Sequence, residues 1–297
     1  MKKQVFAALS MITVGLIAGC GGGGGSDSGV TATSTTISGK VADGYLSGAE
    51  VFLDKNGNYQ WDVNEPRTTT DDNGEYRMTV STADAATCPV IARAIAGMTI
   101  DKDTDTHVTN SYVLCAPAGA AGFISPMSTL IREKMLANPD MTLTEAMTQL
   151  RNQMNLPADT DMMADYVAGS QSGLNATHHQ TMHTIARQMV GLMAGQSPLV
   201  MPDGKSVIVN RYHSMLGAIN SNMSGIAANV ENHLDEHSPF MTTMMTRMQS
   251  QLGTISTTGG FMNYSAMFRN MTSSRNFWNT GSGVHTPQTS MGGGMML

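Results

Sequence analysis

The hydrophobic pattern of this 297-residue chain changes near residue 123. Before that point, short runs of β-type residues alternate with turn signals such as Asp43-Gly44. After it, apolar residues recur at helical spacing, as at Met127, Leu130 and Ile131. A period of two is typical of strands and a period of 3.6 of helices. The sequence therefore predicts an α+β, multi-domain fold in which a β-sandwich precedes a mostly α-helical domain.

The expected elements are bounded by clear local signals. Ser125-Pro126 opens one helix that Asn138-Pro139 ends, and Thr142 with Glu145 forms a capping box that opens a second. Strands are expected at residues 37–41, 49–53, 76–80, 90–95 and 112–114. Further helices are expected at residues 175–194, 207–235 and 240–252.

The amino terminus has the pattern of an export signal. Lys2-Lys3 precedes an apolar stretch over residues 5–18, which is too short to span a bilayer and ends on small residues before Cys20. The end of this stretch resembles the lipobox of bacterial lipoproteins, at Leu16, Ala18, Gly19 and Cys20. The resemblance implies that Cys20 becomes an acylated first residue, carrying chains such as palmitate that hold the protein on a lipid bilayer. With Gly21 next to Cys20, the family analogy favours the outer membrane, facing the periplasm or the cell surface.

Segment boundaries follow from these patterns and from charge. We expect a signal peptide at 1–19, a Gly/Ser/Thr tether at 20–35, a β-sandwich at 36–123, a methionine-rich helical domain at 124–270 and a disordered tail at 271–297. Removal of the leader leaves 15 Lys and Arg against 23 Asp and Glu. This acidic balance argues against a nucleic-acid partner and against a polybasic membrane patch.

Two cysteines remain after Cys20, namely Cys88 and Cys115. In an oxidising compartment two thiols usually pair, so a structural disulfide between them is the first expectation. A redox pair or metal thiolates are the alternatives, although neither has a CxxC spacing behind it.

A segment rich in side-chain oxygens lies between the second and third expected strands. Calcium takes six to eight oxygen ligands, and an EF-hand loop supplies them from positions 1, 3, 5, 7, 9 and 12. Counted from Asp54, these positions hold Asp54, Asn56, Asn58, Gln60, Asp62 and Glu65. The glycine of the sixth position is displaced to Gly57, Tyr59 takes its place, and no helical pattern flanks the segment, so this is not an EF-hand. A calcium site and a polar hairpin turning at Asn-Gly are the competing interpretations.

The flanking residues carry a second resemblance. Residues 44–54, Asn56-Gly57-Asn58, Glu65-Pro66 and 70–76 are similar to the carboxypeptidase-regulatory-like and B-repeat-like domains of bacterial surface proteins. The resemblance implies a prealbumin-like sandwich, with calcium in this loop for the B-repeat type. A later acidic stretch at 101–107 alternates in the same way but lacks the late carboxylate, and it favours a solvated turn.

Methionine is the compositional outlier, with 27 residues in the chain. Flexible thioethers suit a helical core, and they are also soft ligands for Cu(I). His179 and His183 are four residues apart, which is metal-ligand spacing on a helix, but Gln180 stands where a zinc protease has Glu. The methionines fall mostly at apolar helical positions, which favours packing.

The combined expectation is a membrane-anchored, extracytoplasmic lipoprotein with a calcium-stabilised sandwich. Its role would be binding or assembly with an unidentified protein or polysaccharide, without catalysis. Copper binding or redox buffering by Met and His is one alternative. A hydrolase with an accessory sandwich is the other, and it requires His183, His213 or His233 to share a pocket with a nucleophile.

Overall fold

A computed structural model describes residues 33–173 and 175–257. The strands are β1 (Ser34–Val41), β2 (Leu46–Ser47), β3 (Glu50–Leu53), β4 (Arg67–Thr69), β5 (Glu75–Ser81), β6 (Val90–Ala94), β7 (Ile100–Asp101), β8 (Thr106–His107), β9 (Tyr112–Ala116) and β10 (Phe123–Ile124). The helices are α1 (Thr82–Thr87), α2 (Pro126–Ala137), α3 (Leu143–Gln153), α4 (Tyr166–Gly169), α5 (Ala176–Gly195), α6 (Ser197–Val200), α7 (Val209–Ser221), α8 (Met223–Glu231) and α9 (Pro239–Thr254). The α+β class is confirmed.

The described strands form three sheets, in the orders β10-β1-β5, β4-β3-β6-β9 and β2-β7-β8. Strand β5 shows the alternation that the sequence predicts, because Tyr76, Met78 and Val80 are buried while the residues between them are exposed. It pairs antiparallel with β1, which pairs parallel with β10 on its other side. In the second sheet β6 lies antiparallel between β3 and β9.

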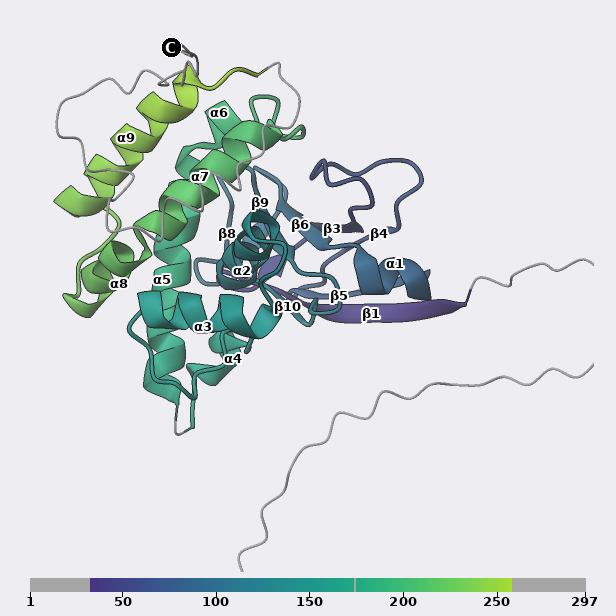
Figure 1. The fold of residues 1–297 in the computed structure, drawn as a ribbon, viewed down its shortest axis with the longest axis horizontal. Coiled ribbons are helices and arrows are strands. Elements are labelled where there is room, and N and C mark those ends of the chain that lie inside the picture. The colour runs from purple at the N-terminus through teal and green to yellow at the C-terminus, as the bar shows by residue number, and fades with distance from the viewer. Residues whose placement is uncertain (1–32, 174, 258–297) are drawn as a thin grey trace, which may run out of the picture. The chain divides into compact units, whose positions relative to one another are not determined.

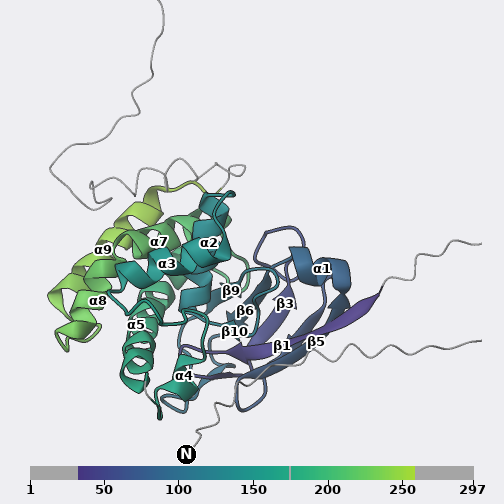
Figure 2. The same ribbon diagram turned by 60° about the horizontal axis from the view of Figure 1, so that its bottom comes forward.

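Helix α2 connects the strands to the other helices (Figure 1). It packs against β9, α3, α5 and α7, and most of its residues are buried on every side. Ser125 caps its first turn, and the Ser128 hydroxyl donates to the Cys115 carbonyl oxygen of β9 at 2.7 Å. Helices α3, α5, α7, α8 and α9 gather beyond α2 on one side of the strands (Figure 2).

One hydrophobic core runs through both regions. It extends from Val41 in β1 to Leu252 in α9, and the described residues belong to one compact unit. The expected boundary at residue 123 falls within β10, which pairs with β1 immediately before α2 begins. Of the other expected segments, the signal peptide, Cys20, most of the tether and the tail at 271–297 lie outside the described residues.

The prediction of a single helix over 207–235 is wrong. Helix α7 ends at Ser221 and α8 begins at Met223. Asn222 lies between the two helices, and both its backbone N–H and its side-chain amide donate to the Ala218 carbonyl oxygen, at 3.2 and 2.9 Å. A side chain that bonds the backbone in this way is typical of helix ends.

Most described methionines lie inside, as the packing interpretation predicts. Phe240 of α9, by contrast, is 36% exposed. Eight of the buried methionines lie on α5, α7, α8 and α9 and belong to the hydrophobic core. All the buried methionines among the described residues are Met78, Met127, Met154, Met162, Met182, Met189, Met193, Met201, Met215, Met223, Met241, Met244 and Met248.

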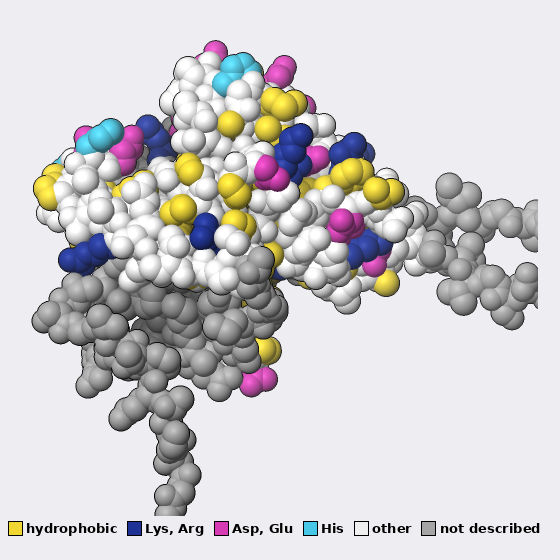
Figure 3. Space-filling model, turned by 90° about the horizontal axis from the view of Figure 1, so that it is seen from above, with side chains coloured by type: hydrophobic (Ala, Val, Ile, Leu, Met, Phe, Trp, Pro, Cys, Tyr) yellow, Lys and Arg dark blue, Asp and Glu magenta, His cyan; other side chains and the backbone are white. Residues whose placement is uncertain are grey.

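The face in Figure 3 carries scattered charges among uncharged polar side chains, with no broad basic patch. This agrees with a chain in which only 13% of residues are charged. No helix among the described residues has both the length and the apolar character to cross a bilayer.

Candidate functional site

Three of the six predicted calcium ligands meet in the segment between β3 and β4. The side-chain amides of Asn56 and Asn58 both donate to Asp62 Oδ2, at 2.7 and 3.0 Å. The amide oxygen of Asn58 accepts from the backbone N–H of Gln60 at 2.8 Å. Asn56 and Asp62 are exposed and Asn58 is half-buried, so this cluster is open to solvent.

Asp54 and Glu65 hold the base of the same loop. Asp54 is 1% exposed, and its carboxylate accepts the backbone N–H groups of Gly57, Asn58 and Tyr59 at 2.7, 3.3 and 3.1 Å. Glu65 accepts the backbone N–H of Lys55 at 2.6 Å and that of Asp62 at 3.0 Å. Burial raises the pKa of the Glu65 carboxyl. Because Asp54 and Glu65 accept these backbone N–H groups, the two carboxylates hold the loop backbone in its conformation.

The loop's donors suit a hard cation. Its groups are one carboxylate and two carboxamides, and oxygens of these types match calcium better than metals that prefer sulfur or nitrogen. The Asn56 and Asn58 side chains turn their nitrogens toward Asp62 and their oxygens toward the backbone N–H groups of Asn58 and Gln60, so a bound ion would take these oxygens in place of those N–H groups. Within residues 33–173 and 175–257 no three His, Cys, Asp or Glu side chains form a group arranged to hold a metal ion. Calcium binding by this loop therefore depends on the side chains of Asn56, Asn58 and Asp62, with Gln60 beside them.

A buried charged cluster lies on the inner side of this loop. Glu133 of α2 is 1% exposed, and its carboxylate contacts Arg132 at 3.0 Å and His213 Nδ1 of α7 at 2.5 Å. Burial alone raises the pKa of Glu133, but His213 and Arg132 outweigh it and hold the pKa below its usual value. Tyr59, from the middle of the loop, donates its hydroxyl to Glu133 at 2.7 Å.

Sequence reasoning missed this cluster. Its signal was the run Arg132-Glu133-Lys134 inside a helix whose pattern is otherwise apolar. Charged residues are almost never fully buried unless they are paired, and the partners Tyr59 and His213 lie more than 70 positions away in sequence.

The structure differs from the expected disulfide, since Cys88 and Cys115 are both free. Cys115 is opposite Ile91 in the sheet, and its sulfur points into the core, 4.0 Å from the Tyr212 hydroxyl. Cys88 lies at the end of α1, with its sulfur 3.7 Å from the Thr87 hydroxyl. Burial raises the pKa of the Cys115 thiol to about 12, which leaves it unreactive.

The second acidic stretch forms the hairpin β7–β8 and is more than a solvated turn. Asp103 Oδ2 lies 2.7 Å from His183 Nε2 of α5, and it also faces Arg187 at 3.9 Å. His179 does not join His183, because its ring packs against Gly169 of α4. The His183 ring also lies 5.6 Å from that of Tyr166 in α4, so both histidines pack against α4. Among the described residues, neither belongs to a group of three or more His, Cys, Asp or Glu side chains arranged to hold a metal ion.

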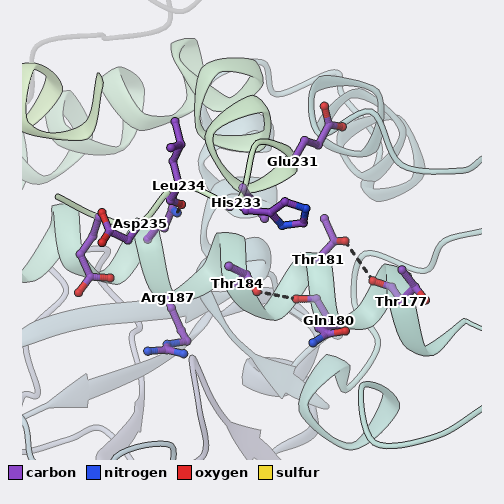
Figure 4. A pocket seen from close by; sticks show the side chains of 12 residues that line it. Thr177, Gln180, Thr181, Thr184, Arg187, Glu231, His233, Leu234 and Asp235 are labelled. Atoms are coloured by element: carbon purple, nitrogen blue, oxygen red, sulfur yellow. Dashed lines mark hydrogen bonds between the residues drawn. The ribbon is translucent and has the colours of Figure 1, made fainter. Parts of the chain in front are cut away.

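A cavity of about 530 Å³, lined mainly by polar residues together with Val230 and Leu234, lies between α5 and the turn that follows α8 (Figure 4). His233 faces Thr181 and Thr184, but these hydroxyls donate to the carbonyl oxygens of Thr177 and Gln180 within α5. The cavity therefore brings a histidine near hydroxyls without a hydrogen bond that would activate one of them. It is lined by Thr177, Gln180, Thr181, Thr184, Arg187, Gln188, Val230, Glu231, His233, Leu234, Asp235 and Glu236.

A buried network holds the wall of this cavity in place. Gln188, which is 3% exposed, donates to the Leu234 carbonyl oxygen at 2.8 Å. Asn229 donates to the Gln188 amide oxygen at 3.1 Å and accepts from the Ser238 hydroxyl at 2.7 Å. Because these amides are paired with one another and with backbone, the cavity is formed before any ligand arrives.

Comparison of the chain with protein-family models, with curated proteins and with solved structures finds no match. The site is therefore interpreted from its own geometry.

Proposed function

We propose that this chain is a lipid-anchored, extracytoplasmic binding or assembly protein whose sandwich is stabilised by calcium. The observation that carries the proposal is the convergence of Asn56, Asn58 and Asp62 on an open loop whose base is fixed by Asp54 and Glu65. When bound, calcium would supply a positive charge that fixes the oxygen-bearing side chains of this loop.

Calorimetric titration with CaCl2 tests the ion site, together with thermal melts in calcium and in chelator. Asp62 is the informative position, because its carboxylate is exposed and accepts only side-chain amides, whereas loss of Asp54 would unfold the loop itself. We expect Asp62→Ala to abolish both the binding heat and the calcium-dependent rise in melting temperature. The matched control is Asp105→Ala in the exposed β7–β8 turn. Equal titrations of wild type and Asp62→Ala would refute the site.

The lipid anchor is supported by the sequence pattern at Leu16, Ala18, Gly19 and Cys20. Growth with radiolabelled palmitate should label the wild-type protein and leave Cys20→Ala unlabelled. Recovery of an unlabelled wild-type protein would remove the anchor from the proposal. The outer membrane, with a periplasmic or surface-facing side, is the proposed location.

The finer fold assignment is part of this proposal. A prealbumin-like sandwich of the B-repeat type is supported by the two larger sheets, β10-β1-β5 and β4-β3-β6-β9, whose residues share one core. The loop between β3 and β4 then corresponds to the calcium loop of that resemblance.

The cavity between α5 and α8 gives the binding role a location. Its volume falls in the range of small-ligand sites, about 300–1,000 Å³. Hydroxyl, carboxamide and carboxylate groups line it, which favours a hydroxyl-rich polysaccharide over an apolar partner segment. Binding to a glycan array should be lost in Thr184→Trp, which fills the cavity from α5, and should persist in Thr246→Trp on the exposed side of α9. A glycan profile unchanged by Thr184→Trp would argue against this location.

A further inference from the structure

Tyr59 joins the calcium loop to the helices. It lies among the predicted ligands, has a φ of 59° and is 1% exposed. A left-handed backbone is unfavourable for a non-glycine residue, so its surroundings must hold it there.

Those surroundings come from α2 and α7. The Tyr59 ring centroid is 4.7 Å from that of Tyr212 and 5.4 Å from that of His213, the latter edge-on. The Tyr59 hydroxyl donates to Glu133 and accepts from Arg132, whose guanidinium also lies 4.8 Å from the ring centroid. The Tyr59 side chain is therefore held by ring contacts and by hydrogen bonds of its hydroxyl, all to residues of α2 and α7.

The same residue is tied to the ligands of the loop. Its backbone N–H donates to Asp54 at 3.1 Å, and its neighbours in sequence are Asn58 and Gln60. A shift of Tyr59 out of its helical contacts therefore moves the backbone that carries two of the predicted ligands.

We propose that calcium binding and the packing of α2 against α7 are coupled through Tyr59, an inference that rests on the calcium site proposed above. An ion that fixes the loop fixes Tyr59 and with it the contacts of Arg132, Glu133 and His213. Coupling between two sites is reciprocal, so loosening the helical contacts weakens calcium binding by the same factor. Tyr59 is in this sense a positioning residue, and calcium regulates the helical region.

Hydrogen exchange of the mature chain tests the first direction. In saturating CaCl2, amides of α2 and α7 should exchange at least about fivefold more slowly than in chelator, the lower end of typical coupling. Tyr59→Phe keeps the ring against Tyr212 and loses the hydroxyl, and it should reduce this protection. Amides of the β1–β5 pair, which lies outside the main contacts of α2 and α7, serve as the internal reference.

Calorimetry tests the reverse direction. His213→Gln lies on α7, outside the predicted ligands, and should weaken calcium binding about fivefold or more. His183→Gln, which loses a contact with Asp103 instead, should leave the affinity unchanged. Tyr59→Phe provides a second, milder variant if His213→Gln fails to fold.

The outcomes separate the two proposals. Absence of calcium binding in the wild-type chain overturns both. Calcium binding with unchanged exchange in α2 and α7, and with equal affinity in wild type and Tyr59→Phe, overturns the coupling and leaves the ion site standing.

Discussion

Asp43, in the turn after β1, is 5% exposed and accepts the Tyr112 hydroxyl at 3.0 Å. Burial, and then the nearby charge of Asp101, raise the pKa of its carboxyl from 3.8 to about 8. Between these two values the folded chain keeps a proton that the unfolded chain has lost. This contribution to stability therefore falls as the pH rises from about 4 to about 8.

Asp43→Asn should remove this pH dependence, because a neutral amide replaces the protonated carboxyl. The free energy of unfolding, from urea titrations at pH 5 and pH 8, should fall less with pH in the variant, by up to about 1.4 kcal/mol per pH unit. Asp105→Asn, on the exposed β7–β8 turn, should retain the wild-type slope over this range. Identical slopes for wild type and Asp43→Asn would contradict the assignment.

The contribution of Glu133 to the pH dependence of stability has the opposite sign to that of Asp43. Its pKa is lowered by His213 and Arg132 against the effect of burial, so its contribution is present at neutral pH and is lost as the pH falls through the folded-state value below 4.5. Glu133→Ala leaves Arg132 and His213 without their carboxylate. It should cost about 3–5 kcal/mol in urea titrations at pH 7. The same change at the exposed Glu236 should have little effect, and a similar loss at both positions would be inconsistent with a buried pair.

At the scale of single elements, the stability of α2 depends on the hydrogen bonds of its first turn. The Ser125 and Ser128 side chains satisfy one another's backbone N–H groups, and the Ser128 hydroxyl also bonds β9 through the Cys115 carbonyl oxygen. At the start of α3, Thr142 and Glu145 form a similar box, but on the exposed surface.

Ser128→Ala should therefore cost more than Thr142→Ala. The first leaves buried backbone groups unpaired, at about 1–3 kcal/mol, and the second loses an exposed cap, at about 1 kcal/mol. Denaturant titrations of the two single variants compare them directly. Equal losses would mean that the link from α2 to β9 adds no stability.

The elements predicted from sequence were those with strong local signals. The five longer strands lie at the predicted runs of β-type residues, and helices α2 and α3 begin directly after the caps Ser125 and Thr142. The two- and three-residue strands were missed because they have too few residues for a period. The break at Asn222 was missed because the apolar residues on its two sides keep a helical spacing and neither Gly nor Pro marks it.

In the calcium loop, too, the features set by neighbouring residues were predictable and those set by distant residues were not. The spacing of oxygen-bearing side chains from Asp54 to Glu65 predicted a loop at this position. In the structure the backbone N–H groups of Gly57 and Tyr59 donate to the Asp54 carboxylate, which is a local contact of that loop. The burial of Tyr59 was not readable, because Glu133 and His213 approach it only after α2 and α7 have packed.

For the molecule as a whole, the shared core connects strands and helices. Residues of β1, β9, α2 and α7 belong to one buried cluster, and Tyr59 ties the loop to α2 and α7. A chain with one core should unfold in one cooperative transition. In a Trp278→Phe background, Trp61 is the one remaining tryptophan of the 297-residue sequence. Its fluorescence, which reports on the loop, and far-UV circular dichroism, which reports mainly on the helices, should give coincident urea midpoints. Separate midpoints would show that the two regions fold independently.

The most direct test of the calcium loop is terbium luminescence excited through tryptophan. Trp61 lies inside the loop, where its indole N–H donates to the Glu65 carbonyl oxygen at 2.8 Å. An ion held by Asn56, Asn58 and Asp62 would therefore be sensitised by Trp61. In a Trp278→Phe background, which leaves Trp61 as the one tryptophan, we predict terbium emission that calcium displaces and that Asp62→Ala abolishes. Trp61→Phe in the same background should be dark but should still bind calcium by calorimetry. No sensitised emission in the wild-type chain, or emission that persists in Asp62→Ala, would contradict the account.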